Sequence, residues 1–541
     1  MSTISRREIL AAFLGMPVAL AACSRLRTPP LPDGEIVGTS DVFGHKLRDG
    51  LRVDVPADAW TNVPIVIVGG GVAGLTAAWR LKNSGVNDFV LLELEPAPGG
   101  TSRSGSNRGI SFPCGAHYIP APLKENVELV SLLDEMGVLE GKDAEGEPVV
   151  REQFLCRDPE ERVFFKGRWY EGLYLHAGAS EKDKEQLDKF NAEIARWVAW
   201  RDAKGRRAFT LPVSACSDDP VVTALDQLSM SAWLDNRGWW SSRLRWWVNY
   251  ACRDDYGMNT DASAWAGLFY FCSRVAKPGV ESQSLITWPE GNGHLVNYLF
   301  EKTKSHVQLD RAAVELIPVE ENGRARVDVI TLDREGRNPR GFRAERVIFA
   351  APQFMARHVV RPYRDNPPSH IEEFQFGAWM VANLTLRDRP KHSQRDFPPA
   401  WDNVLYESPS LGYVVATHQR GQDYGPTVLT YYYPMVGSSA RLGREQLLEA
   451  GWKEWADVIL TDLEQAHPDI RQLVERIDVM RWGHAMIRPR TGFMWGPARR
   501  EGAKPFRSIH FAHSELSGVA LFEEAFDVGV RVADEVRLTR A

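Results

Sequence analysis

The sequence predicts a mixed α/β fold, α+β overall, from the order of its apolar runs and glycines near residue 70. The apolar run Pro64–Val68 is followed directly by the glycine-rich turn Gly69–Gly74 and by the helical stretch Leu75–Leu81. A second apolar run, Phe89–Leu92, completes the unit. Strand, glycine turn, helix and strand in this order are typical of the Rossmann-like domain that binds the pyrophosphate of a dinucleotide.

Each glycine of the turn has its own role in this interpretation. A side chain at Gly69 would crowd the tight turn, and one at Gly71 would hold the backbone away from the phosphates. A side chain at Gly74 would push the helix off the sheet. The first turn of the helix, with Val72 and Ala73, would then face the negative charge with free backbone amides.

The residues after this unit indicate which dinucleotide is bound. Glu93 follows Gly74 by 19 residues, close to the usual spacing of about 20 residues to the acid that binds the ribose hydroxyls. After five intervening residues comes Gly99-Gly100-Thr101-Ser102-Arg103. Here the chain resembles the FAD-binding flavoprotein superfamily of amine oxidases, protoporphyrinogen oxidases and phytoene-type desaturases. Thr101 stands where that superfamily most often has arginine, so the phosphate-facing charge could come from Arg103.

Later segments extend the resemblance along the chain. They are Gly115–Tyr118, Trp288–Leu295, Val314–Ile317, Arg346–Pro352, Ile509–Glu515 and Phe522–Val532. The resemblance implies that Val314 holds the adenine through its backbone and that Glu515 ends the strand beside the flavin. His513 and Glu524 stand where the superfamily usually has glycine, so we expect the flavin contact to be altered there.

The resemblance also implies two interleaved domains. A Rossmann-like FAD-binding domain would comprise residues 60–125, 285–355 and 478–541, and a substrate domain with a mixed sheet and helices would comprise residues 126–284 and 356–477. The superfamily's monoamine oxidases tether FAD through a cysteine in their C-terminal third. Because the last cysteine of this chain is Cys272, we expect FAD to be bound without a covalent link.

The substrate pocket is the part that the sequence defines least. The resemblance places His117, Tyr118, Trp482 and His484 near the flavin, as substrate-pocket candidates. The tryptophan-rich stretch 230–265 reads as helical core or as an aromatic wall for an apolar or cationic substrate, since tryptophan faces attract ammonium groups. Amine oxidases of the group usually carry a lysine near flavin N5, and Met380 occupies the expected place here.

These residues leave three functions open. The first is an FAD-dependent oxidase or dehydrogenase that transfers a hydride from a substrate C–H to flavin N5, with an amine slightly favoured. The second is a desaturase-type enzyme for an apolar substrate. The third is a lipid-anchored flavin-binding partner protein without turnover, a view favoured by Met380, His513 and Glu524. For an enzyme, oxygen or a membrane electron acceptor would take up the electrons. No individual catalytic residue is assigned.

The N-terminus predicts export and a membrane anchor. Arg6 and Arg7 precede the apolar stretch Ile9–Ala22, a pattern typical of a twin-arginine signal. Leu20-Ala21-Ala22-Cys23 resembles the bacterial lipobox, in which the cysteine is acylated and becomes the new N-terminus. Residues 24–59 would then form a tether. We therefore expect a membrane-anchored lipoprotein on the periplasmic or extracytoplasmic side.

Composition excludes several other classes. The formal net charge is −6, and no basic run interleaved with aromatic residues suggests nucleic-acid binding. Beyond Cys23, the cysteines are Cys114, Cys156, Cys216, Cys252 and Cys272. Their odd number and the lack of C-x-x-C spacing argue against a zinc site, so no metal site is expected.

Overall fold

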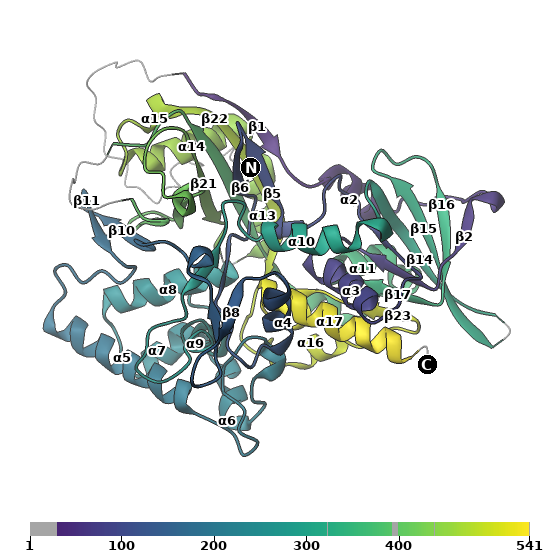
Figure 1. Ribbon diagram of the computed structural model, residues 1–541, viewed down its shortest axis with the longest axis horizontal. Helices are drawn as coiled ribbons and strands as arrows, with labels where there is room; N and C mark the ends of the chain where they lie inside the picture. The colour runs from purple at the N-terminus through teal and green to yellow at the C-terminus, as the bar shows by residue number, and fades with distance from the viewer. Residues whose placement is uncertain (1–29, 322, 392–398, 438, 540–541) are drawn as a thin grey trace, which may run out of the picture.

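Five short parallel strands form the central sheet of the dinucleotide-binding lobe. Their order is β13 (Val307–Gln308), β4 (Phe89–Leu92), β3 (Ile65–Val68), β17 (Arg346–Phe349) and β23 (Ile509–Phe511). Strands β3 and β4 are buried over their whole length, as expected of parallel strands covered on both faces. The computed structural model describes residues 30–321, 323–391, 399–437 and 439–539 (Figure 1).

Helices cover one face of this sheet and a second sheet covers the other. Helix α3 (Val72–Asn83) packs against α17 (Phe522–Leu538) and α10 (Gly293–Thr303). A Cβ on Gly529 of α17 would lie 2.6 Å from the Ala73 carbonyl oxygen, so the two helices touch there along their backbones. The second sheet has the order β14 (Arg311–Glu321), β15 (Arg324–Asp333), β16 (Arg340–Ala344) and β2 (Trp60–Asn62).

The other lobe is built on an eight-stranded mixed sheet. Its order is β1 (Asp33–Val37), β22 (Val474–Ile487), β18 (Phe376–Leu386), β21 (Thr427–Pro434), β20 (Gly412–Val415), β19 (Asp402–Leu405), β10 (Glu161–Phe165) and β11 (Arg168–Glu171). Met380 and Trp379 of β18 belong to different apolar clusters, because neighbouring side chains of a strand point to opposite faces.

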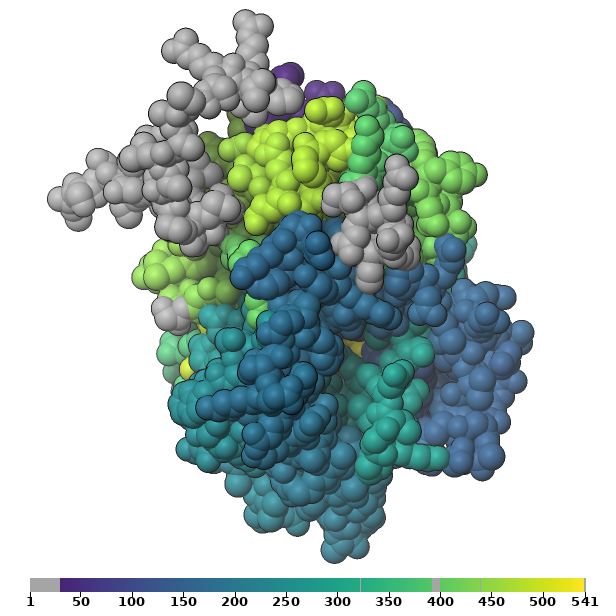
Figure 2. Space-filling view, turned by 90° about the vertical axis from the view of Figure 1, so that its left-hand side faces the viewer, coloured from purple at the N-terminus to yellow at the C-terminus, as the bar shows by residue number. Residues whose placement is uncertain are grey.

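Helices lie on both sides of the eight-stranded sheet. One side carries α13 (Ala440–Glu449) and α14 (Trp452–Glu464), and the other carries a helical layer of α5 (Glu181–Ala199), α7 (Met230–Asn236), α8 (Ser242–Tyr256) and α9 (Ala264–Cys272). Figures 1 and 2 show the blue-to-teal helical layer below and the yellow-green α14 region above. In the tryptophan-rich stretch, Trp233 and Trp265 are core residues, whereas Trp240 is exposed. These three fit the core interpretation better than an aromatic wall.

The remaining elements pack around these sheets and helices. They include α2 (Asp41–Arg48), β5 (Ser104–Asn107), β6 (Ile110–Pro113), β7 (Tyr118–Pro120), α4 (Val127–Glu135), β8 (Leu139–Lys142), β9 (Pro148–Val150), α6 (Pro220–Thr223), β12 (Leu285–Thr287), α11 (Gln353–Val359), α12 (Arg361–Asp365), α15 (Ile470–Leu473) and α16 (Pro497–Gly502). None of the helices in the described part of the chain is long and apolar enough to cross a membrane.

The structure adds to the expected domain plan at two places. Residues 33–48, expected in an extended tether, form β1 and α2 and pack on both lobes. Strand β22 begins at Val474 and carries residues 478–487 into the eight-stranded sheet, although these residues were assigned to the FAD-binding domain. The expected signal and Cys23 lie outside the described residues.

Candidate functional site

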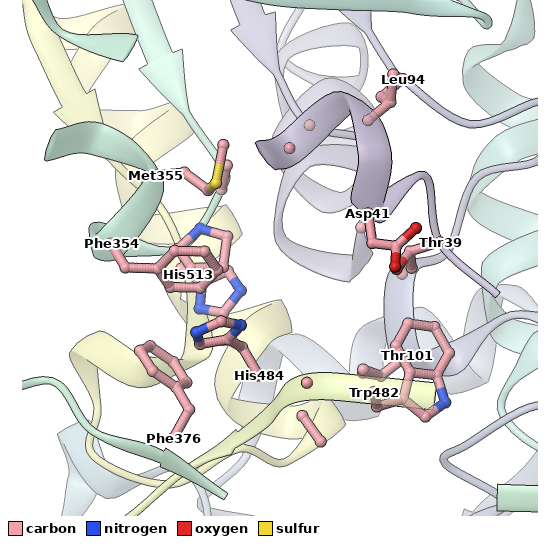
Figure 3. A pocket seen from close by; sticks show the side chains of 18 of the residues that line it. Thr39, Asp41, Leu94, Thr101, Phe354, Met355, Phe376, Trp482, His484 and His513 are labelled. Carbon is pink, nitrogen blue, oxygen red and sulfur yellow. The ribbon is translucent and has the colours of Figure 1, made fainter. Parts of the chain in front are cut away.

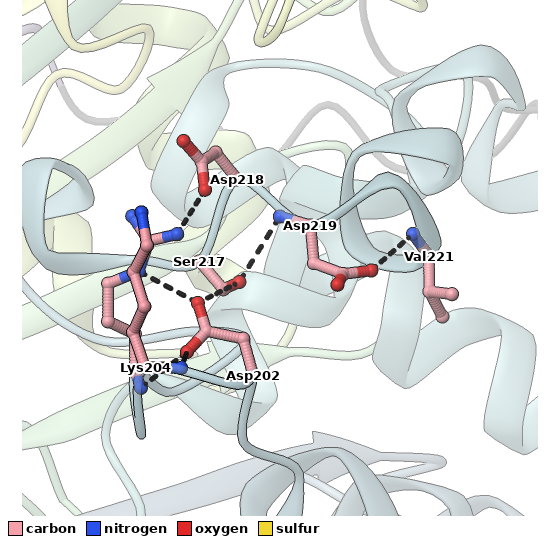
Figure 4. A network of polar contacts seen from close by, with 7 residues as sticks. Asp202, Lys204, Ser217, Asp218, Asp219 and Val221 are labelled. Carbon is pink, nitrogen blue, oxygen red and sulfur yellow. Dashed lines mark hydrogen bonds and ion pairs between the residues drawn. The ribbon is translucent and has the colours of Figure 1, made fainter.

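A cavity of about 1300 Å³ lies between the two lobes. Its lining combines the glycine turn, the end of β4, the paired glycines after it and the start of α17. From the other lobe come residues of β22 and α13, and a further wall comes from residues 36–48. Figure 3 shows Thr101 and Trp482 beside Thr39 and Asp41. The cavity is large enough for a cofactor together with part of a substrate.

The glycine turn leaves open space only at the position expected to face phosphate. A Cβ on Gly71 would meet no atom within 4 Å and would project from a residue that lines the cavity. A Cβ on Gly69, whose φ is +105°, would lie 2.6 Å from the Ala350 carbonyl oxygen. A Cβ on Gly74 would lie 1.9 Å from the Gly69 carbonyl oxygen. Val72 and Ala73 line the cavity as well.

Glu93 lies at the cavity wall beside this turn. Its Oε2 accepts a hydrogen bond from the Gly70 amide at 2.6 Å, and its Oε1 accepts one from the Glu95 amide at 2.8 Å. These bonds fix the carboxylate, and each oxygen keeps a lone pair for a ribose hydroxyl. Burial raises the pKa of Glu93, while the two amides oppose that shift.

The paired glycines and Thr101 line the cavity, but Arg103 does not. Gly99 and Gly100 have φ of +115° and +56°, in the region that favours glycine. The Arg103 guanidinium lies 5.4 Å from the centre of the Trp482 ring and donates to the Met480 sulfur at 3.5 Å. Its charge therefore lies behind the cavity wall.

Among the histidines that line the cavity, His484 and His513 lie across from Thr39 and Asp41. The His484 ring stacks on Phe354 at a centroid distance of 4.0 Å, with Phe376 at its edge. Burial, with Arg444 nearby, lowers the pKa of His484 to about 3, and burial lowers that of His513 to about 4. Both rings are therefore neutral at pH 7. Figure 3 shows both imidazoles together with the phenyl rings.

Val314 and Glu515 lie next to the cavity rather than in its lining. Val314 is the extra residue at a register shift of β14, and its carbonyl accepts from Arg364 at 3.0 Å. The preceding Ala312 and Ala313 line the cavity. Glu515 is buried and accepts from the Gln353 amide at 2.6 Å. Burial raises its pKa to about 8.

Two residues that differ from those usual in the resembled superfamily also lie away from the cavity. Met380 is fully buried in the apolar cluster that contains Trp455, so its side chain points to the α14 face of the sheet. Glu524 is buried and accepts from the Val213 amide at 2.8 Å. Burial raises its pKa to about 8.

His117 and Tyr118 belong to a separate aromatic cluster. The His117 ring centre lies 4.7 Å from that of Tyr432, 5.2 Å from that of Trp401 and 5.0 Å from that of Tyr118. Burial lowers the pKa of His117 to about 4. The cluster adjoins the cofactor cavity, because Ala116 lines that cavity and the Tyr432 hydroxyl donates to the Gly115 carbonyl at 2.9 Å.

Carboxylates lie next to this aromatic cluster. The Tyr118 hydroxyl donates to Asp254 at 3.3 Å, and the Tyr250 hydroxyl donates to Asp402 at 3.3 Å. Burial and neighbouring acids raise the pKa of Glu161 to about 8 and that of Asp254 to about 7. Burial and the same two acids raise the pKa of Asp402 well above its usual value.

No salt bridge of the described residues reaches Glu161, Asp254 or Asp402; Arg274 pairs with the adjacent Asp255 instead, at 2.8 Å. All three retain some exposed surface. We call Glu161, Asp254 and Asp402 the acidic cluster. Sequence analysis missed it, because its members come from three distant segments and only the fold brings them together.

The described residues hold no group of three or more histidine, cysteine, aspartate or glutamate side chains arranged for a metal ion. The five described cysteines are free thiols.

Comparisons with known proteins agree with this architecture. A family model described as an NAD(P)-binding Rossmann-like domain matches residues 67–136. A putrescine oxidase bound to putrescine superposes with a TM-score of 0.61 at 17% identity, over 88% of this chain and 100% of its own. Cyclohexylamine oxidase from Brevibacterium oxydans superposes with a TM-score of 0.60 at 15% identity, over 89% of this chain and 100% of its own. The chain has the fold of the flavin amine oxidases.

That fold serves more than one chemistry. A fatty acid isomerase from P. acnes superposes with a TM-score of 0.60 at 16% identity, over 89% of this chain and 99% of its own. Among curated proteins, the Baeyer-Villiger monooxygenase peniC of Penicillium patulum is 54% identical over 77 residues, and protoporphyrinogen oxidase 2 of Arabidopsis thaliana is 32% identical over 94 residues. The first stretch covers 13% of this chain and 12% of the monooxygenase, and the second covers 17% of this chain and 18% of the protoporphyrinogen oxidase.

Proposed function

We propose that the protein is an FAD-dependent oxidoreductase of the amine oxidase-like superfamily. The observation that carries this proposal is the cavity with an open glycine cradle at Gly71 and a fixed carboxylate at Glu93. These residues fit a dinucleotide, since a Cβ at Gly71 would occupy the space that a phosphate needs. When bound, FAD would supply hydride acceptance at N5 from a substrate C–H.

We propose that FAD is held without a covalent bond, since the described cavity lining contains no cysteine that could form a thioether to it. Precipitation of the purified protein with acid should leave yellow FAD in the supernatant. Colour that stays with the pellet would refute non-covalent binding. A folded protein that is colourless and takes up no FAD would refute the whole proposal.

The substrate that we favour is a cationic amine. The acidic cluster beside the aromatic rings of Tyr118, Trp401 and Tyr432 would attract an ammonium group through its ionised carboxylates, Asp254 first as the pH rises through 7, and through the ring faces. The likeness to putrescine and cyclohexylamine oxidases supports the same class. Anaerobic addition of mono- and diamines should bleach the flavin spectrum, and acetylated analogues without the charge should not.

An apolar substrate is the second candidate. The rings of Phe354 and Phe376 with the neutral His484 form an uncharged wall of the cavity. Bleaching of the flavin by unsaturated or cyclic apolar compounds, but not by amines, would favour a desaturase-type function. If no compound of either class reduces bound flavin, the protein would instead be a flavin-binding partner without turnover.

We further propose export by the twin-arginine route and a lipid anchor at Cys23 on the extracytoplasmic side. Support comes from Arg6-Arg7, the apolar stretch after them and the lipobox-like Leu20–Cys23. A folded cofactor protein suits a route that carries folded proteins. Reoxidation would use oxygen or a membrane electron acceptor, and peroxide release under air distinguishes the first from the second.

A further inference from the structure

The N-terminal strap, defined as residues 33–48, crosses from one lobe to the other. Strand β1 pairs in parallel with β22 from Asp33↔Arg476 to Val37↔Met480. Glu35 also forms an ion pair with Arg476 at 2.5 Å. Figure 1 shows the purple strap leaving the edge of the eight-stranded sheet and reaching the dinucleotide-binding lobe through α2.

The strap is anchored equally firmly at its other end. The Ser40 amide donates to Glu95 Oε1 at 2.7 Å, and the Ser40 hydroxyl donates to Glu95 Oε2 at 3.2 Å. Glu95 in turn donates its amide to Glu93, the residue expected to bind ribose. Phe43 and Leu47 are 3% and 4% exposed and belong to the same apolar core as the parallel sheet.

Between these anchors, the strap forms a wall of the cofactor cavity. Residues 36–41, with Gly44, His45, Leu47 and Arg48, line it. Figure 3 shows Thr39 and Asp41 across the cavity from Phe354 and His513. Phe43, by contrast, anchors α2 without lining the cavity. The anchor can therefore be weakened without removing an atom that would touch a ligand.

Resting on the proposed function, we infer that the strap is a part of the dinucleotide-binding site that retains the cofactor. Exit past this wall requires at least one anchor to open. Opening at the α2 end exposes Phe43 and Leu47 and breaks both Ser40–Glu95 bonds, and each of these costs free energy. Release past the strap is therefore slow, and binding of the dinucleotide in turn holds the strap closed.

The test compares two substitutions on α2. Phe43→Ala removes a buried anchor, whereas Val42→Ala trims a side chain that is 67% exposed on the same helix. After dilution of the FAD-loaded proteins, the rise of free-flavin fluorescence should be at least about tenfold faster in Phe43→Ala, which matches a loss of roughly 1.4 kcal/mol. Val42→Ala should release FAD at the wild-type rate.

Equal release rates in the two variants would overturn the inference. Hydrogen exchange provides a second measurement on the wild-type protein, so the test does not depend on the folding of Phe43→Ala. FAD should slow exchange of the amides of residues 36–48, and exchange in the strap that is unchanged by bound FAD would also overturn it. If wild-type protein takes up no FAD at all, the proposed function fails and the inference fails with it.

Discussion

At the scale of single residues, two glycines of one turn carry opposite constraints. Gly71 has open space where a Cβ would be, while at Gly74 a Cβ would lie 1.9 Å from a backbone oxygen. Gly71 also has φ of −70°, which alanine adopts without strain. The first glycine thus leaves room for a ligand, and the second allows the helix to pack.

This difference predicts separate phenotypes. Gly71→Ala should fold with an unchanged melting temperature but lose FAD affinity by tenfold or more, because its methyl group enters the phosphate space. Gly74→Ala should instead lower the melting temperature, because the clash is with backbone that cannot move independently. Thermal unfolding of the FAD-free proteins and FAD titration measure the two effects. A Gly71→Ala protein with normal FAD affinity would place the phosphates elsewhere.

The acidic cluster predicts a pH dependence of amine binding. The pKa of Asp254 is raised to about 7, so the carboxyl becomes charged as the pH rises from 6 to 8, while an aliphatic ammonium stays protonated. Affinity for a cationic amine should therefore increase over this range. Asp254→Asn should weaken binding about 10- to 100-fold at pH 8, equal to roughly 1.5–3 kcal/mol, and flatten the profile.

The exposed Asp58 provides the control, because Asp58→Asn should leave the pH profile unchanged. Tyr118, Asp255, Arg274 and Arg253 also face Asp254, as do Glu161 and Asp402, and all of them are intact in both variants. The pH dependence of folding stability has the opposite sign to that of amine affinity. A raised carboxyl pKa stabilises the fold below the unfolded pKa of about 4, and this contribution is lost as the pH rises through 7. An amine affinity independent of pH would remove Asp254 from the binding site.

A second group of buried residues predicts one bound water molecule. Asn126, Ser273, Arg274 and Glu523 line a cavity of about 10 Å³, and each is at least 94% buried. One polar atom of each has no hydrogen-bond partner among the described residues: Asn126 Nδ2, Ser273 Oγ, Arg274 Nε and Glu523 Oε1. A water can accept from the two nitrogens and donate to the two oxygens, whereas a metal ion cannot bond to the N–H groups.

A high-resolution crystal structure should show this water with contacts of about 2.7–3.2 Å. Ser273→Ala should keep the water and lower stability by about 1 kcal/mol. Ser84→Ala, at the exposed serine that follows α3, should have no effect. Direct contact of Glu523 with Arg274, without a water between them, would contradict the prediction.

At the scale of elements, strand parity explains what sequence analysis could and could not place. The β3–α3–β4 unit was predictable because its strands are short apolar runs next to diagnostic glycines. Position alone could not decide which way Met380 points, since a shift of one residue moves a side chain to the other face of a strand. The structure places Met380 against α14 and gives Trp379 the opposite face.

This orientation predicts a structural role for Met380. Met380→Ala should lower the free energy of unfolding by about 2–5 kcal/mol, because it empties a fully buried site. The absorption spectrum of bound flavin should not change, because the side chain does not line the cavity. A shifted flavin spectrum without loss of stability would show that Met380 does face the ring.

At the scale of the whole molecule, neither the N-terminal strap nor the acidic cluster could be predicted from the sequence, and the reason is the same for both. Each depends on residues far apart in the chain, such as Asp33 with Arg476 and Tyr118 with Asp254. The glycine turn and Glu93 were accessible because one local unit contains them. The long-range contacts also place residues 33–48 against the cofactor cavity, directly after the expected signal and anchor.

This order of segments gives the last prediction. Replacing Arg6 and Arg7 with lysine should trap folded, FAD-loaded protein in the cytoplasm, because the twin-arginine pair would no longer be read. Cys23→Ala should keep flavin binding intact but release soluble protein or leave an uncleaved precursor, since anchoring requires the acylated cysteine. Cell fractionation, with Cys156→Ala as the matched cysteine control, measures both. Normal export of the lysine form would refute the route, and an unmodified N-terminus beyond residue 23 would refute the anchor.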